Sequence, residues 1–177
     1  RSVEREPHLF RRTVADVHFG HSREKAAVEQ GSGSRIRQFV IAGYPFDYAF
    51  PDARRQGLEL RARLRRLGVK FIIGYFDQNE GAHRKIMGGR SRIQEDYHFL
   101  AAKVAADPEL GLLLKPKRPA TLAARLGPVW GSLEALVQSG RCILLEGGDP
   151  ESSYLPCVAS TGADVTVNLL YGGTAGL

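Results

Sequence analysis

A basic loop at residues 115–119 (KPKRP) directly follows a short run of leucines at 112–114. Its cations are Lys115, Lys117 and Arg118, and charges held at one point can stabilise a leaving diphosphate. The guanidinium of Arg118 suits paired hydrogen bonds to phosphate, whereas the ammonium of Lys115 acts as a point charge. The two prolines stiffen the backbone between these cations. The loop therefore indicates phosphate binding, with a solvated charged turn as the alternative.

Two further polar loops follow apolar runs and contain groups that could contact a nucleotide. The first begins with Asp77, Gln78 and Asn79, whose side chains could bind a phosphate or an acceptor hydroxyl. The second begins with Glu146 and Gly147, and its glycines would let the edge of a planar base approach the backbone. A plain surface turn explains either loop equally well.

A fourth loop contains Gly172, Gly173 and Thr174, after an apolar run at 165–167 and before what should be a helix. The free N–H groups and the dipole at a helix N-terminus favour a bound anion. The loop matches neither the G-x-G-x-x-G pattern nor the Walker pattern. It therefore predicts a diphosphate contact and disfavours dinucleotide oxidoreductases and P-loop enzymes.

Metal and disulfide chemistry receive little support from the sequence. Asp16, His18 and His21 could bind a metal, but they have no second ligand cluster, so the histidines are expected to line a cleft or cap a helix. Cys142 and Cys157 belong to no CxxC motif. Two lone cysteines are typical of small buried side chains in a reducing compartment.

These loops need strands to position them, and the apolar runs supply them. The runs are short, rich in β-branched and leucine side chains, and do not alternate with polar residues. Continuous runs of this kind are typical of parallel strands that are buried on both faces. We expect strands at 17–19, 39–41, 69–76, 110–114, 142–145 and 165–167.

Helical patterns separate the later strands. Proline and glycine residues stand where helix start and stop signals belong. We expect helices at 51–67, at 93–106, from Pro119 through 126, from Trp130 to Gly140, and within 152–161 beginning or bending at Pro156. The alternation from residue 69 predicts a Rossmann-like, doubly wound α/β domain with a parallel sheet, whose ligands bind beyond the carboxyl ends of the strands.

The region before residue 51 has a different composition. Residues 29–35 (EQGSGSR) predict a flexible loop, and a turn at Gly43-Tyr44-Pro45 follows the strand at 39–41. We therefore expect residues 1–50 to be the end of a preceding domain plus a linker, and residues 51–177 to be most of a second domain. Because the sheet would then be incomplete at both ends, we expect the chain alone to be inactive and poorly soluble.

Charge is uneven along the chain. Residues 1–92 carry 19 Lys and Arg against 10 Asp and Glu, whereas residues 93–177 carry 6 against 9. Six arginines lie between Arg54 and Arg66, which raises the alternative of a nucleic-acid-binding module. Leucines at positions 60, 64 and 67 instead predict an amphipathic helix with a solvated arginine face. No apolar run approaches the roughly 20 residues of a transmembrane helix.

The order of these motifs resembles the GT-B superfamily of glycosyltransferases, in which two Rossmann-like domains face each other across a cleft. Within this superfamily, the order of motifs most resembles that of surface-polysaccharide and CDP-glycerol glycerophosphotransferase-like enzymes. The resemblance covers about residues 14–177. Its motifs are FVIAGYPFD at 39–47, VKFIIGYFDQN at 69–79, the basic K-P loop at 115–119, ADVTVN at 163–168 and GGTAG at 172–176.

The resemblance implies a transferase of surface polysaccharide synthesis that uses a nucleotide-activated donor as substrate and no separate cofactor or metal. It implies catalytic roles for Lys115 and Arg118. Its donor-binding residues would be Lys117, Asp77, Gln78, Asn79, Glu146, Gly147, Gly172, Gly173 and Thr174. CDP-glycerol enzymes have a histidine in the basic motif, where this chain has Lys117 and Arg118.

The resemblance further implies a cytoplasmic location, with peripheral association at the inner face of the membrane. The acceptor would be a polysaccharide or a lipid-linked glycan, and nucleic acid would not be a partner. A sugar-nucleotide 2-epimerase of the same architecture is the nearest alternative, because it would share the nucleotide cleft but need no acceptor.

Overall fold

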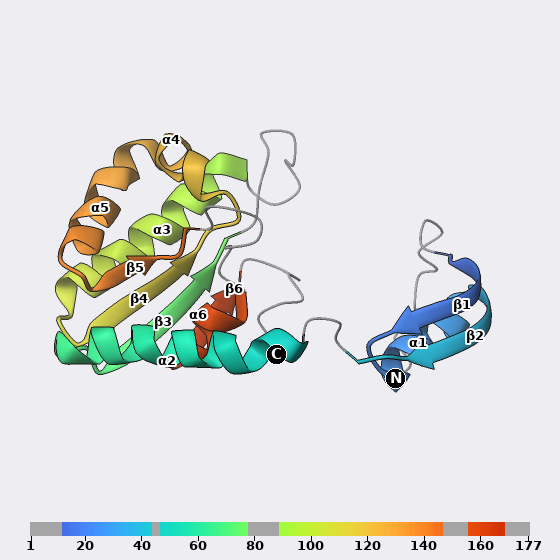
Figure 1. Cartoon of the computed structure of the whole chain (residues 1–177). Helices are drawn as coiled ribbons and strands as arrows, with labels where there is room; N and C mark the ends of the chain where they lie inside the picture. The colour runs from blue at the N-terminus through green and yellow to red at the C-terminus, as the bar shows by residue number, and fades with distance from the viewer. Residues whose placement is uncertain (1–11, 44–46, 78–88, 147–155, 169–177) are drawn as a thin grey trace, which may run out of the picture. The chain divides into compact units, whose positions relative to one another are not determined.

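The computed structural model describes residues 12–43, 47–77, 89–146 and 156–168 (Figure 1). The chain divides into two compact units, Arg1–Phe50 and Pro51–Leu177. The assignment of these units to the two domains of a glycosyltransferase stays a prediction.

The first unit is a small β-α-β arrangement. Strand β1 (Val14–Gly20) and strand β2 (Arg35–Ile41) are parallel, and helix α1 (Arg23–Gly31) joins them. The side chain of Ser22 caps α1 by accepting a hydrogen bond from the Lys25 N–H. A parallel pair needs such a crossover, so α1 accounts for the connection between the two strands.

The expected loop at 29–35 is wrong at both ends, because α1 continues to Gly31 and β2 begins at Arg35. The buried carboxylate of Glu29 explains the helical end of this segment. It accepts hydrogen bonds from Lys25 Nζ at 2.5 Å and Ser34 Oγ at 3.0 Å. These contacts tie the last turn of the helix to the segment that enters β2, and they hold the pKa of Glu29 below its ordinary value.

The second unit contains a four-stranded parallel sheet in the order β5-β4-β3-β6. Its strands are β3 (Phe71–Phe76), β4 (Leu110–Lys115), β5 (Cys142–Leu144) and β6 (Val165–Asn168). Its helices are α2 (Phe50–Arg66), α3 (Gly89–Ala106), α4 (Leu122–Leu126), α5 (Trp130–Gln138) and α6 (Pro156–Gly162). Short 3-10 turns lie at Asp47–Ala49, Pro119–Thr121 and Gly127–Val129.

This topology confirms the expected α/β fold with a parallel sheet. The chain runs outward from β3 to β4 and β5, and then crosses back to β6 on the other side of β3. The reversal places the switch point of the sheet between β3 and β6, as in Rossmann-like folds. The carboxyl ends of all four strands meet at one edge, which is where the predicted loops begin.

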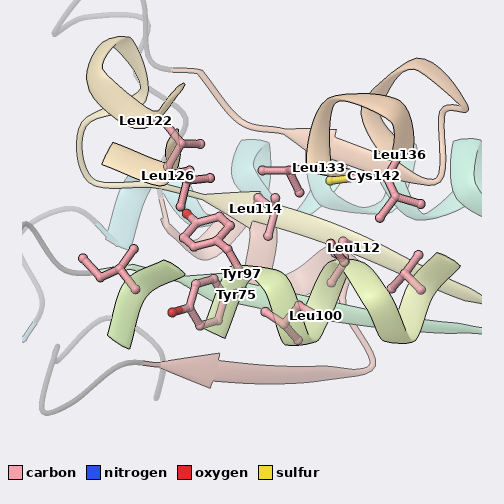
Figure 2. Packing of buried hydrophobic residues seen from close by; sticks show 13 residues of the cluster. Tyr75, Tyr97, Leu100, Leu112, Leu114, Leu122, Leu126, Leu133, Leu136 and Cys142 are labelled. Atoms are coloured by element: carbon pink, nitrogen blue, oxygen red, sulfur yellow. The ribbon is translucent and has the colours of Figure 1, made fainter. Parts of the chain in front are cut away.

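Helices lie on both faces of the sheet (Figure 1), and a hydrophobic cluster on each face includes residues of β3, β4 and β5. Alternate residues of β4 divide between them, with Leu112 and Leu114 on one face and Leu113 on the other. Figure 2 shows the larger cluster, in which helices α3, α4 and α5 pack on the sheet. Helices α2 and α6 cover the opposite face. Burial on both faces explains why β3, β4 and β5 appear in the sequence as unbroken apolar runs.

Helix α2 departs from its expected apolar stripe at one position. Leu64 is fully buried and Leu60 is partly buried, but Leu67 is 49% exposed. The helix ends at Arg66, and Gly68 adopts a φ of +86° that reverses the chain just beyond it. Leu67 therefore lies in the turn and leaves the helical periodicity.

The arginine face of α2 is only partly solvated. Arg61 and Arg65 both form ion pairs with Asp164, which precedes β6, and the Asp164 carboxylate also accepts from the Ile72 N–H at 2.8 Å. Arg55 pairs with acidic residues of its own helix. Three of the six arginines thus form ion pairs, either within α2 or between α2 and the residue that precedes β6.

Candidate functional site

Asp77 is the centre of a polar cluster at the carboxyl edge of the sheet. It directly follows β3, and its side chain is fully buried. Its Oδ1 accepts a hydrogen bond from the Lys117 N–H at 2.5 Å. Its Oδ2 accepts from Arg125 Nη2 at 2.8 Å and from the Tyr97 hydroxyl at 3.3 Å. A buried carboxylate needs this many partners to offset its lost hydration.

These bonds fix the basic loop to the end of the neighbouring strand. The Lys117 N–H belongs to residues 115–119, so its bond to Asp77 joins the end of β3 to the loop that follows β4. Both carboxylate oxygens are engaged within the protein. In this arrangement Asp77 positions the cations, and its direct contact with a donor stays a prediction.

Lys115 is the last residue of β4 and is only partly buried. Its Nζ donates to the carbonyl of Pro116 at 3.3 Å. Burial lowers the pKa of Lys115, while the nearby Asp77 carboxylate acts in the opposite direction. A partly desolvated ammonium retains donors for an anion at the sheet edge, because an ammonium has three.

The side chains of Lys117 and Arg118 are exposed, in contrast to the backbone that carries them. The carbonyl of Arg118 accepts from Thr121 N–H at 3.3 Å and from Arg125 Nη2 at 3.4 Å. The loop is therefore held through its main chain and presents two charged side chains outward. This geometry suits electrostatic stabilisation, which depends on charges that are fixed before the ligand arrives.

Arg125 is the residue that sequence reasoning missed. It lies on α4 between the fully buried Leu122 and Leu126, and its own side chain is only 12% exposed. Its Nε and Nη1 are buried and have no hydrogen-bond partner among the residues that the structure describes. Unsatisfied donors of a buried guanidinium favour an acceptor at this position, an anion or a water molecule. An arginine amid leucines on an apolar helix was the available signal, since arginine is rarely buried without a partner.

Two tyrosines close the inner side of the cluster. Tyr75 on β3 and Tyr97 on α3 meet edge to face, with ring centroids 5.2 Å apart. Burial raises the pKa of Tyr97 well above its ordinary value, and the Asp77 carboxylate adds to the effect. Tyr97 is therefore a neutral hydrogen-bond donor to Asp77 and not an acid of the site.

Of the remaining predicted residues, the structure describes only Glu146, which does not join this cluster. Glu146 is exposed just beyond β5, at the same edge of the sheet, where it lines a half-open cavity of about 410 Å³ with Arg63 and Trp130. In the described part of the chain, no hydrogen bond or ion pair joins Glu146 to the Asp77 cluster. The predicted residues Gln78, Asn79, Gly147, Gly172, Gly173 and Thr174 lie outside the described residues.

His18 and His21 of the first unit have structural contacts. The ring of His18 packs on Phe39 with centroids 5.1 Å apart, and His21 Nδ1 lies 3.1 Å from the carbonyl oxygen of Gly43. Within residues 12–43, 47–77, 89–146 and 156–168, no group of three His, Cys, Asp or Glu side chains could hold a metal. Cys142 and Cys157 are free thiols, and burial raises the pKa of Cys142 to about 12.

Comparison with protein-family models, with curated proteins and with solved structures finds no match to this chain. Among the described helices, none combines the length and the apolar character needed to cross a membrane.

Proposed function

We propose that this chain binds a nucleotide-activated donor and belongs to a glycosyltransferase or glycerophosphotransferase-like enzyme of surface polysaccharide synthesis. The observation that carries the proposal is the basic loop at 115–119, which the buried Asp77 carboxylate holds at the carboxyl edge of the sheet. Ligands of open parallel α/β sheets bind at this edge. Lys115 and Arg118 would neutralise the leaving diphosphate, and Lys117 would contact the donor.

Arg125 supports the same assignment. Its two unsatisfied donors lie next to the basic loop, because Arg125 Nη2 contacts both Asp77 and the carbonyl of Arg118. Donors and charges that converge on one edge favour a ligand that carries several negative oxygens. A diphosphate meets this description better than a neutral metabolite does.

The nucleic-acid alternative loses support from the same structure. Ion pairs within the second unit neutralise the charges of Arg55, Arg61 and Arg65. The exposed arginines that remain on α2 form a smaller positive surface than the sequence alone predicts. Binding through phosphate contacts requires several such charges to act together.

Isothermal titration of the chain with UDP, CDP and the matching nucleosides tests the proposal. We expect the diphosphates to bind and the nucleosides to bind far more weakly, because the site recognises phosphate. Lys115→Ala should weaken diphosphate binding about tenfold, equivalent to about 1.4 kcal/mol. Lys70→Ala is the matched control, since Lys70 is an exposed lysine that precedes β3 at the opposite end of the sheet.

Two results would contradict the proposal. The first is that no nucleoside diphosphate binds to the folded chain. The second is that diphosphates bind equally well to the wild type and to Lys115→Ala, which would remove the basic loop from the site.

A further inference from the structure

An exposed apolar strip runs along one side of α3. Its members are Phe71 on β3, Phe99 on α3, and Val165 and Val167 on β6, with exposed fractions between 43% and 59%. We call these four residues the β6 strip. Large apolar side chains that gather on one surface mark interaction sites more often than scattered ones do.

The register of the sheet places the members of the strip together. Val165 and Val167 are paired with Ile73 and Tyr75 of β3, so they share a face of the sheet with the cluster beneath α3. The Tyr75 hydroxyl donates to Asp96 Oδ2 at 3.3 Å, which brings that flank of α3 over the β3 side of the strip. Figure 2 shows Tyr75 and α3 above the ribbon of β6. Parallel sheets are normally covered on both faces, whereas Val165 and Val167 on this part of the face are each 43% exposed.

The flank of α3 beside the strip carries a regular charge pattern. Arg92, Asp96, Phe99, Lys103 and Asp107 are spaced by three or four residues. At 3.6 residues per turn they fall within about 80° of arc. Within the described part of the chain, none of the four charged side chains belongs to an ion pair. The flank is therefore a line of unneutralised charges around a central exposed phenylalanine.

The order of the charges along α3 is reversed in sign on the two sides of Phe99. Starting from Phe99, the charges are negative and then positive toward the N-terminus, at Asp96 and Arg92. They are positive and then negative toward the C-terminus, at Lys103 and Asp107. A two-fold axis beside Phe99 would place every charge opposite one of the other sign. Isologous dimers require this self-complementarity of a single patch.

The single chain gains little from the same charges. Arg92 stands near the N-terminus of α3 and Asp107 follows its last residue, and the helix dipole disfavours both signs. In both i,i+4 combinations on this flank the basic residue precedes the acidic one, which is the weaker order for a pair within a helix. Within the chain, Asp107 Oδ1 accepts from the Glu109 N–H at 2.8 Å, and Lys103 Nζ lies 5.4 Å from the centroid of the Phe99 ring. Neither contact supplies an opposite charge, which a second molecule could provide.

We infer that the second unit forms a homodimer through α3 and the β6 strip. The two α3 helices cross antiparallel, with the Phe99 rings at the axis and packed toward the strip. Asp96 pairs with Lys103 of the partner subunit, and Arg92 pairs with Asp107 of the partner subunit. Opposite charges at these positions fix the register, while burial of the apolar strip supplies most of the affinity.

Sedimentation equilibrium across a concentration series tests the dimer directly. The wild type should sediment as a dimer, and Phe99→Asp should raise the dimer dissociation constant by about a hundredfold or more. The far-UV circular dichroism of the variant should match the wild type, because Phe99 is 59% exposed in the single chain. A wild type that remains monomeric at every concentration would overturn the inference.

A charge-reversal pair separates this interface from any other. Lys103→Glu places two carboxylates together at each contact, and Asp96→Lys places two ammonium groups together, so each variant alone should be monomeric. An equimolar mixture should restore a dimer that contains one copy of each variant. His98→Glu is the matched control, because it adds a carboxylate to α3 about 100° away from Phe99.

The mixture decides the outcome even if one variant is less stable. Recovery of a mixed dimer, with no recovery when either variant is mixed with the control, confirms the predicted pairing. If both variants dimerise alone, or if the mixture stays monomeric while the wild type dimerises, α3 is not the interface and the inference is wrong.

Discussion

The buried ion pair between Asp77 and Arg125 predicts an asymmetric response to substitution. Asp77→Ala would remove the partner of a guanidinium that is 12% exposed and already has two unsatisfied donors. It would also release the Lys117 N–H and the Tyr97 hydroxyl. Removal of one partner from a buried pair costs about 3–5 kcal/mol. The loss of the two further hydrogen bonds, at about 1 kcal/mol each, places this variant toward the upper end of that range.

Replacement of both partners should cost less than replacement of one. In Asp77→Leu with Arg125→Met, no buried charge is left without a counter-ion, and the two apolar side chains fill a similar volume. Buried pairs exchanged for apolar residues are often neutral in stability. We therefore expect the double variant to recover about 2 kcal/mol or more relative to Asp77→Ala.

Urea denaturation of each variant, followed by circular dichroism, measures these differences. The control is Asp52→Ala, because Asp52 is 57% exposed in its pair with Arg55 and should contribute less than about 1 kcal/mol. The reasoning is refuted if Asp77→Ala loses no more stability than the control. It is also refuted if the double variant is less stable than the single one. Since Asp77 holds the basic loop, both variants should also bind UDP and CDP more weakly.

Two further predictions concern the packing of α2. Asp164 is partly buried, which by itself would raise its pKa. The hydrogen bond from the Ile72 N–H and the guanidinium groups of Arg61 and Arg65 outweigh this effect and lower the pKa of Asp164 overall. Its stabilising effect is thus full above about pH 4 and is lost as the pH falls through its depressed pKa in the folded state. Urea midpoints measured from pH 6 to acid should converge for the wild type and Asp164→Asn, and parallel curves would contradict the linkage. Separately, a Cβ on Gly57 would lie 2.6 Å from the carbonyl oxygen of Val158, so Gly57→Ala should destabilise by about 1–3 kcal/mol. As a control, Gly131 lies on α5 where a Cβ would meet open space, so Gly131→Ala should be neutral or stabilising by up to about 1 kcal/mol. Thermal melts of both glycine variants measure these differences.

Local sequence patterns were sufficient for most elements of the second unit. Unbroken apolar runs marked β3, β4 and β5, because strands buried on both faces have no polar alternation. A short run also marked β6, although its Val165 and Val167 are 43% exposed. Proline and glycine marked the helix boundaries, as the +86° φ of Gly68 and the +78° φ of Gly140 illustrate. In the first unit the apolar runs at 17–19 and 39–41 marked parts of β1 and β2, but the glycine signal failed. A Gly- and Ser-rich segment predicted a loop, whereas the contacts of Glu29 extend the helix into it.

The candidate site was predicted only in outline. The loop cations and Asp77 could be found from the sequence, since polar residues after buried strands gather at one edge of a parallel sheet. The positioning role of Asp77 could not be predicted from the sequence, because its partner Arg125 lies 48 residues away on α4. The arginines of α2 were likewise expected to face solvent, and two of them pair instead with Asp164, about 100 residues later.

In the second unit, the sequence by itself determined which segments become strands and helices and where the charged loops fall, because periodicity and turn chemistry act between near neighbours. Only the tertiary structure decided which charges are neutralised inside the fold and which remain available. That choice depends on distances between segments far apart in the chain. It is why Asp77 positions the basic loop while the charges along α3 remain unpaired within the described chain.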